Sequence, residues 1–137
     1  MQNESPSAHD LMLASLDAVA QADVDIVPVY FERFFGRFPA EEQNFYNKDS
    51  SRGLMVNDML SMLLGQAEGA EWMPMMMRTQ VITHRDHGDI ALERYRDALD
   101  LLVTVLADVA GDRWCAAYEQ AWRGETAKMF ALIERAY

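Results

Sequence analysis

Apolar residues recur at helical spacing along most of this chain. Residues 5–21 place Leu, Val and Ala near helical spacing after a start rich in Ser and Pro, which predicts a first helix. Residues 23–39 open with a capping residue, Asp25, and carry a wide Phe-rich side until Pro39 ends the segment. The first third of the chain is therefore predicted to form two amphipathic helices.

The rest of the chain continues the same period after a short helical turn and a polar loop. Residues 51–67 repeat Met and Leu on one side, and residues 71–84 begin with Pro74 in the first turn and end at a histidine. Two long periodic segments follow, at 91–111 and 112–137, with almost nothing between them. Such a short connection predicts that the last two helices form an antiparallel hairpin.

Composition agrees with an all-α fold. The chain has 137 residues, of which 50% are hydrophobic, and only 7 Gly and 4 Pro. Met, Leu and Ala favour helices over strands, and this length allows a single domain to bury a real core. We therefore expect one all-α domain over residues 1–137.

Charge and the remaining residues exclude several classes of function. The formal net charge of −10 opposes binding to a phosphate backbone, so we expect no nucleic-acid partner. No long uncharged apolar run and no basic leader followed by apolar residues occur, which predicts a cytoplasmic protein without a membrane partner. The lone Cys115 has no partner for an internal disulfide and is expected to be a small buried residue.

The order of several residues resembles that of the globin family over nearly the whole chain. A Phe-rich helix carries Phe35 and ends at Pro39, Phe45 follows six positions later, and His84 and Tyr95 precede and open the two long helices. Each motif is weak alone, but their order and separations agree together. The resemblance implies a globin-like fold of about seven to eight helices around a haem pocket.

The resemblance also implies a cofactor, haem b (iron protoporphyrin IX), and a ligand for its iron. His84 falls where globins place the proximal histidine, Phe45 where a phenylalanine stacks against haem, and Tyr95 where an aromatic residue opens the next helix. A neutral imidazole binds iron through one nitrogen while the other donates a hydrogen bond, for which Gln80 and Thr83 are nearby candidates. The alternative role of His84 is a helix cap or a surface residue.

A second histidine, His87, stands three positions after His84 and directly before Gly88. It is the rival ligand, but the glycine indicates a corner instead of a helix face. Globins often carry a basic or polar group at this point that reaches a haem propionate, and His87, Arg52 or Arg78 is the candidate for that contact.

The opposite, distal side departs from the familiar globin pattern. The position of the usual distal His or Gln falls on Leu54 or Met55, and the second helix offers Phe31, with Tyr30 beside it. Met59 extends this apolar wall by one turn. None of Phe31, Met55 and Met59 donates a hydrogen bond to a gas; Met55 either packs there or serves as a sixth iron ligand.

The function that the resemblance implies is a haem-binding globin that binds a diatomic gas, O2, NO or CO, at a His-ligated iron. NO dioxygenation or a weak peroxidase activity would need a separate reductase, because no flavin or nicotinamide region occurs. The apolar distal side keeps a second class open, a haem-free globin-like sensory or interaction module with an apolar cavity. A third is a helical protein unrelated to globins that has no such site.

The last two helices carry more aromatic residues than one packed face needs. We expect some of them to be exposed and to form a homodimer through these helices, because twofold pairing is the commonest oligomer. The residues concerned are Trp114, Tyr118, Trp122 and Phe130.

Overall fold

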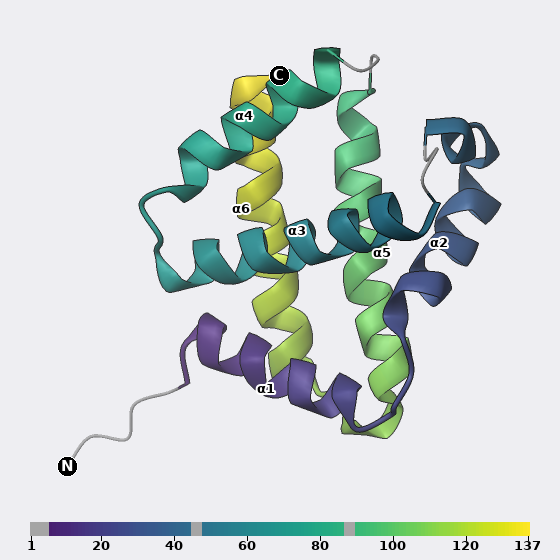
Figure 1. Ribbon diagram of the computed structural model, residues 1–137. Coiled ribbons are helices and arrows are strands. Elements are labelled where there is room, and N and C mark those ends of the chain that lie inside the picture. Colours follow the sequence, from purple (N-terminus) through teal and green to yellow (C-terminus); the bar gives the residue numbers. More distant parts are fainter. Residues whose placement is uncertain (1–5, 45–47, 87–89) are drawn as a thin grey trace.

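The computed structural model describes residues 6–44, 48–86 and 90–137, and in these ranges the chain forms six α-helices, two 3₁₀ helices and no strand (Figure 1). The α-helices are α1 (Ala8–Ala20), α2 (Ile26–Arg37), α3 (Lys48–Glu68), α4 (Met73–Asp86), α5 (Leu92–Ala110) and α6 (Ala116–Ala136). The 3₁₀ helices are η1 (Pro39–Asn44) and η2 (Gly111–Arg113). The all-α class is confirmed. In place of the expected seven to eight helices, the described ranges hold six α-helices and the two short 3₁₀ helices, and the finer expectation of a globin-like fold stays a prediction.

Local chemistry explains several of the helix boundaries. The Asp25 carboxylate accepts a hydrogen bond from the Val27 amide at 3.0 Å, which caps the first turn of α2 as predicted. Gly69, which follows α3, has a φ of +84°, a backbone conformation that residues with a Cβ rarely adopt. The last helix begins later than the predicted segment 112–137, because residues 111–113 form η2 and α6 begins only at Ala116.

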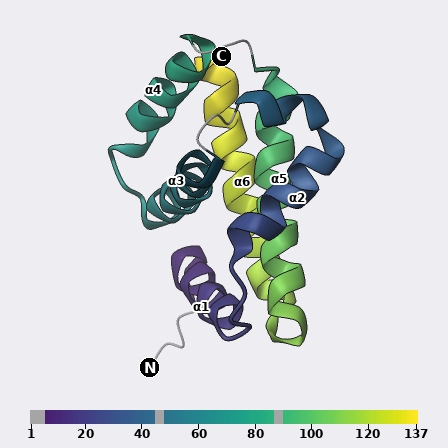
Figure 2. The ribbon, with the colours of Figure 1, turned by 45° about the vertical axis from the view of Figure 1, so that its right-hand side comes forward.

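The antiparallel pair α5 and α6 forms the centre of the fold (Figures 1 and 2). Leu102, Val103, Val105 and Leu106 on α5 have no exposed surface, and Trp122 on α6 is equally buried. Such burial stabilises the fold by roughly 1.5–3 kcal/mol for each large apolar side chain. The predicted hairpin of the last two helices is confirmed.

The other helices pack around this pair. α1 contacts α5 and α6 near their connected ends, α2 packs on α5, and α4 packs on α6. α3 contacts α6 and meets α4 at the connection 69–72, from which the two helices diverge (Figures 1 and 2). No helix in the described ranges is long and apolar enough to cross a membrane.

Two buried polar contacts tie distant segments together. The Trp122 indole donates a hydrogen bond to the Ser15 hydroxyl at 2.7 Å, and that hydroxyl donates to the Met12 carbonyl at 2.6 Å. The Tyr30 hydroxyl donates to the Ala98 carbonyl at 2.8 Å and so joins α2 to α5. Because each donor has an acceptor, these groups are buried without the cost of an unmade hydrogen bond.

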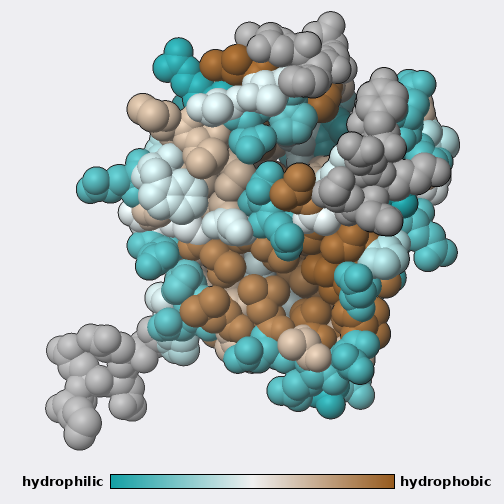
Figure 3. Space-filling model, viewed as in Figure 1, coloured by the Kyte–Doolittle hydropathy of each residue, from teal (hydrophilic) through white to brown (hydrophobic). Residues whose placement is uncertain are grey.

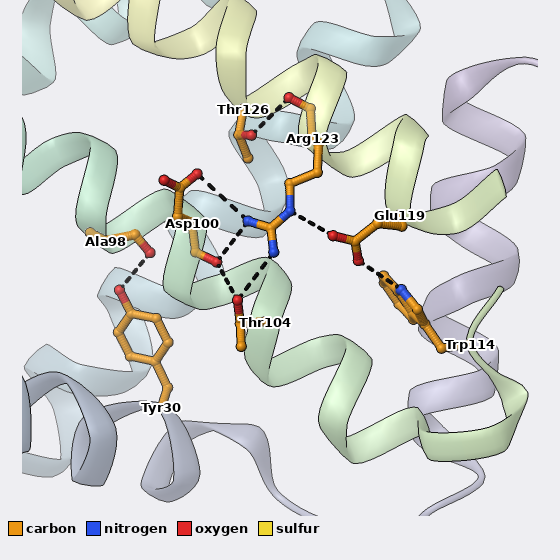
Figure 4. A network of polar contacts seen from close by, with 8 residues as sticks. All are labelled: Tyr30, Ala98, Asp100, Thr104, Trp114, Glu119, Arg123 and Thr126. Atoms are coloured by element: carbon orange, nitrogen blue, oxygen red, sulfur yellow. Dashed lines mark hydrogen bonds and ion pairs between the residues drawn. The ribbon is translucent and has the colours of Figure 1, made fainter. Parts of the chain in front are cut away.

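A polar network on the outer side of α5 and α6 holds their faces together (Figure 4). The Arg123 guanidinium donates to Glu119 at 2.7 Å, to the Asp100 carbonyl at 3.1 Å and to the Thr104 hydroxyl at 3.1 Å. The Trp114 indole donates to the other oxygen of Glu119 at 3.0 Å. This network therefore reaches from the start of α6 to the middle of α5.

Two of the four aromatic residues on which the predicted homodimer depends are buried within one chain. Trp122 is fully buried and Phe130 is only 7% exposed, so both belong to the core of one chain. Trp114 and Tyr118 are half-buried and pack edge to face on one another, with ring centroids 5.7 Å apart. The homodimer stays a prediction, without the surplus of exposed aromatic surface that motivated it.

Exposed apolar residues gather in two other places. On the face shown in Figure 3, apolar residues cover the lower half, between α3 and α1. A second group lies on or beside α4 and consists of Trp72, Met75, Met76 and Ile82. Cys115 is exposed and not buried as expected.

Candidate functional site

His84 lies on the last full turn of α4, on the side that faces the core. Met77 and Val81, seven and three positions earlier, are 5% and 1% exposed, and the half-buried His84 continues the same side of the helix. Its Nδ1 lies 2.7 Å from the Gln80 carbonyl oxygen. Of the two acceptors expected from the sequence, Gln80 is therefore the observed one.

This hydrogen bond fixes the state of the imidazole ring. A carbonyl oxygen can only accept, so Nδ1 must carry the proton that the bond uses. In the neutral ring the lone pair then belongs to Nε2, the nitrogen on the other side of the ring. That tautomer is the one a histidine needs in order to bind a metal through Nε2.

Tyr95 packs against the ring of His84, and Tyr137, the residue after α6, packs against Tyr95. Tyr95 on α5 meets the His84 ring edge to face, with centroids 5.9 Å apart, and Tyr137 meets Tyr95 in the same way at 6.4 Å. The Tyr137 hydroxyl donates to the Ile90 carbonyl at 2.7 Å. The residue after α6 thus holds Ile90, which lies just before α5.

Phe31, the predicted site residue on α2, is almost fully buried. It is 1% exposed and its ring lies 5.0 Å from Tyr30 and 5.3 Å from Phe35, centroid to centroid. Burial raises the pKa of Tyr30, which stays protonated and donates to Ala98. The Tyr30 hydroxyl is therefore committed to α5 and is not a donor for a ligand beside Phe31.

α3 contributes the two methionines of the expected distal wall. Met55 and Met59 are half-buried and pack against the core, whereas Leu54 is 61% exposed. Of the two candidates for the distal position, Met55 is therefore the one on the inner side. No hydrogen bond, ion pair or ring contact joins His84 to Met55 or Met59 in the described ranges.

Two arginines next to the aromatic cluster were not predicted to pack there. The Arg52 guanidinium on α3 lies 5.7 Å from the ring centroid of Phe31 and 4.8 Å from that of Phe35. Arg94 on α5 lies 3.6 Å from the Phe38 ring centroid. Arg52 was predicted only as a candidate for a propionate contact, and Arg94 was not singled out. The spacing of Arg52 from Met55 and Met59, three and seven residues, could have indicated its side of α3.

The glutamates of η1 face these arginines. A carboxylate oxygen of Glu41 lies 2.9 Å from Arg94, and one of Glu42 lies 3.9 Å from Arg52. Within the described ranges the Nε atoms of both arginines are buried and make no hydrogen bond, although an Asp97 carboxylate oxygen lies 3.8 Å from that of Arg94. An N–H group without an acceptor costs free energy, so each Nε is an open donor at the edge of the aromatic cluster.

Two of the predicted site residues, Phe45 and His87, lie outside the described residues. The others fall into two groups, His84 with Tyr95, and Phe31 with Met55 and Met59 on the adjoining helices. Arg78, the other candidate for a propionate contact, is exposed on α4. No group of three or more His, Cys, Asp or Glu residues that could hold a metal ion occurs in the part of the chain that the structure describes.

An open groove of about 250 Å³ lies between α5 and α6. Arg96, Asp100, Arg123 and Glu134 supply its charged lining. Arg96 lies 4.2 Å from the Phe130 ring centroid, and Arg123 is bound within the network of Figure 4. Arg123 is therefore committed to that network, and the Phe130 ring is the contact partner of Arg96.

Comparison with known proteins adds no relative. No protein-family model, no curated protein and no solved structure matches this chain.

Proposed function

We propose that this chain is a haem-binding globin that binds a diatomic gas at an iron held by His84. The observation that carries the proposal is the hydrogen bond from His84 Nδ1 to the Gln80 carbonyl, because it leaves the lone pair on Nε2 for a metal. The order of six helices and the inward position of His84 on α4 are further support.

The two groups of predicted site residues offer the types of side chain that a haem group needs. His84 Nε2 would hold the iron, and Phe31, Met55 and Met59 would supply the apolar wall that excludes water. The open donor on Arg52 suits a carboxylate such as a propionate. When bound, haem supplies an iron that can take up a small gas molecule.

The distal wall favours some gases over others. A ligand that gains stability from a donated hydrogen bond, as O2 does, gains little from Phe31, Met55 or Met59, and Tyr30 is already bonded to Ala98. NO and CO depend less on such a donor. We therefore expect poor discrimination in favour of O2, which argues against simple oxygen storage.

One observation favours the alternative, a haem-free module with an apolar ligand or a filled interior. Phe31 is 1% exposed, so protein atoms already cover its ring in the chain without a cofactor. A haem group would have to displace some of these atoms. The two functions make different predictions for the uptake of hemin.

The deciding experiment is titration of the purified haem-free chain with hemin, followed by the Soret band. We expect saturable uptake by the unaltered chain, loss of that uptake in His84→Ala, and no change in the control His9→Ala, whose histidine lies on α1. Added imidazole should restore the spectrum in His84→Gly, because the free base replaces the missing side chain. An unaltered chain that stays colourless, or a His84→Ala variant that binds hemin equally well, would refute the proposal.

A further inference from the structure

The side of α4 that faces away from the core carries an exposed apolar patch. α4 lies at the edge of the fold, where it packs on α6 and meets α3 (Figures 1 and 2). Residues three, four, six and seven positions apart share one side of a helix or lie close to it. The residues so spaced are Trp72, which is 50% exposed, Met75 (76%), Met76 (41%) and Ile82 (45%), and together they form the α4 patch.

The charge around the α4 patch differs from that of the rest of the chain. The net charge is −10, yet residues 72–85 contain neither Asp nor Glu, and no other stretch of this length is free of acids. Two copies of so acidic a chain repel one another over most of their surfaces. The α4 patch is therefore the face on which two copies meet with the least repulsion.

Two opposite charges flank the α4 patch in a way that suits a second copy. Glu71 and Arg78 are both exposed, and neither side chain forms an ion pair within the described ranges. They stand seven positions apart, almost two helical turns, which places both on one flank of the patch. In a twofold contact residue i meets residue j, and residue j meets residue i. A twofold axis close to Met75 therefore sets Glu71 of each copy beside Arg78 of the other.

The size of the α4 patch indicates a reversible dimer. The exposed surface of its four side chains is on the order of 400 Å², the size of the largest apolar patch on an ordinary monomer. A standard interface buries about 800 Å² on each partner, so the patch supplies roughly half and the polar residues around it supply the rest. We therefore expect a dissociation constant in the micromolar range.

We propose that the α4 patch binds the same patch of a second copy, with the two α4 helices antiparallel about a twofold axis. Met75 lies at the centre of this contact, and the pairs of Glu71 with Arg78 lie at its two ends. This pairing differs from the contact through α5 and α6 that the aromatic residues suggested. It requires no haem, so its test is independent of the proposed function.

Sedimentation velocity over a range of protein concentrations tests the pairing. We expect a monomer–dimer equilibrium that Met75→Asp weakens at least about tenfold, because two carboxylates would then meet at the axis. Met75 lies in the first turn of α4, where an acidic side chain favours the helix, so this variant should keep its helical circular-dichroism spectrum. Leu13→Asp makes the same change at a residue of α1 that is 44% exposed, and this control should dimerise like the unaltered chain.

A charge swap tests the antiparallel arrangement. Arg78→Glu sets two carboxylates side by side at each end of the contact and should raise the dissociation constant about tenfold. Glu71→Arg combined with Arg78→Glu restores opposite charges in both pairs, so the double variant should recover most of the lost affinity. A contact through any other face would not show this recovery.

Several results would overturn the proposal. One is a chain that stays a monomer at about 1 mM. Another is a dimer that Leu13→Asp weakens and Met75→Asp does not, and a third is a double variant that dimerises no better than Arg78→Glu alone. A monomer whose tryptophan emission shifts to the blue on addition of phosphatidylcholine vesicles would assign the α4 patch to a lipid surface instead.

Discussion

Gly65, inside α3, lies against the ring of Trp72 at the connection between α3 and α4. A Cβ added to Gly65 would lie 2.6 Å from Cη2 and 2.7 Å from Cζ2 of Trp72, which is far inside van der Waals contact. Trp72 is 50% exposed, so its ring can move outward, but only by giving up its contact with α3. The substitution Gly65→Ala therefore has two opposite effects on stability: a higher helix propensity stabilises the chain, and a steric clash with Trp72 destabilises it.

The magnitudes of the two effects decide the sign. Alanine in a helix interior is more stable than glycine by about 1 kcal/mol. Overpacking a close contact costs about 1–3 kcal/mol. We therefore expect Gly65→Ala to leave the free energy of unfolding unchanged or to lower it by up to about 2 kcal/mol. Gly124→Ala on α6, where no atom lies within 4 Å of the added Cβ, should raise it by up to about 1 kcal/mol.

A double-mutant cycle isolates the clash. Urea unfolding, followed by circular dichroism, should show that Gly65→Ala becomes stabilising by about 1 kcal/mol when Trp72 is replaced by Ala, because the ring that it meets is gone. The m-value should stay constant across the four chains if they unfold as one domain. A Gly65→Ala variant as stabilised as Gly124→Ala, in the presence of Trp72, would show that the ring does not lie on Gly65 in solution.

Two further predictions concern hydrogen bonds at the ends of α6. Burial raises the pKa of Glu119, but the hydrogen bonds from Arg123 and Trp114 and the charge of Arg123 outweigh it, so the pKa lies below its ordinary value. A carboxyl group whose pKa is lowered by folding stabilises the chain above its pKa in the unfolded chain, about 4.3, and this stabilisation is lost as the pH falls through its pKa in the folded chain. We therefore expect Glu119→Gln to lower the free energy of unfolding by less than about 1 kcal/mol at pH 7, and by a smaller amount in acid. Unfolding curves at several pH values would contradict this if the difference in the free energy of unfolding between the unaltered chain and Glu119→Gln grew on acidification. Tyr137→Phe removes the donor to the Ile90 carbonyl, so amide hydrogen exchange just after residue 90 should quicken about fivefold, and an unchanged rate would mean that the bond adds no stability there.

The helices and their order could be predicted because they depend on local signals. The apolar period gives the helices, Asp25 caps α2 through its own backbone neighbourhood, and Gly69 supplies the positive φ after α3. Gly65 lies within α3 and not at its end, where a glycine is common. Because Gly65 has no Cβ, the Trp72 ring can lie against it. The local pattern of apolar and polar residues does not indicate such a contact between a helix and a connecting segment.

The candidate site could be predicted only in part, for the same physical reason. His84, Phe31 and Met55 fall on the inner sides of their helices as their spacing implies. The packing of Arg52 on Phe31 joins residues on different helices, and the hydrogen bond from Tyr30 to Ala98 spans 68 positions. Amphipathic patterns indicate which side of a helix is buried, but not which residue on another helix it will meet.

The methionines of α4 lie on two sides of the helix, one buried and one exposed. Met73 and Met77 are 1% and 5% exposed, whereas Met75 and Met76 are 76% and 41% exposed, so the thioethers spread around the helix and do not converge on one point, as binding of a metal by them would require. The buried side continues through Val81 to His84. Fold stability alone would favour an apolar residue at that position, because leucine would bury more apolar surface without a polar nitrogen to satisfy. The hydrogen bond to Gln80 satisfies Nδ1, and under the proposed function Nε2 would hold the haem iron.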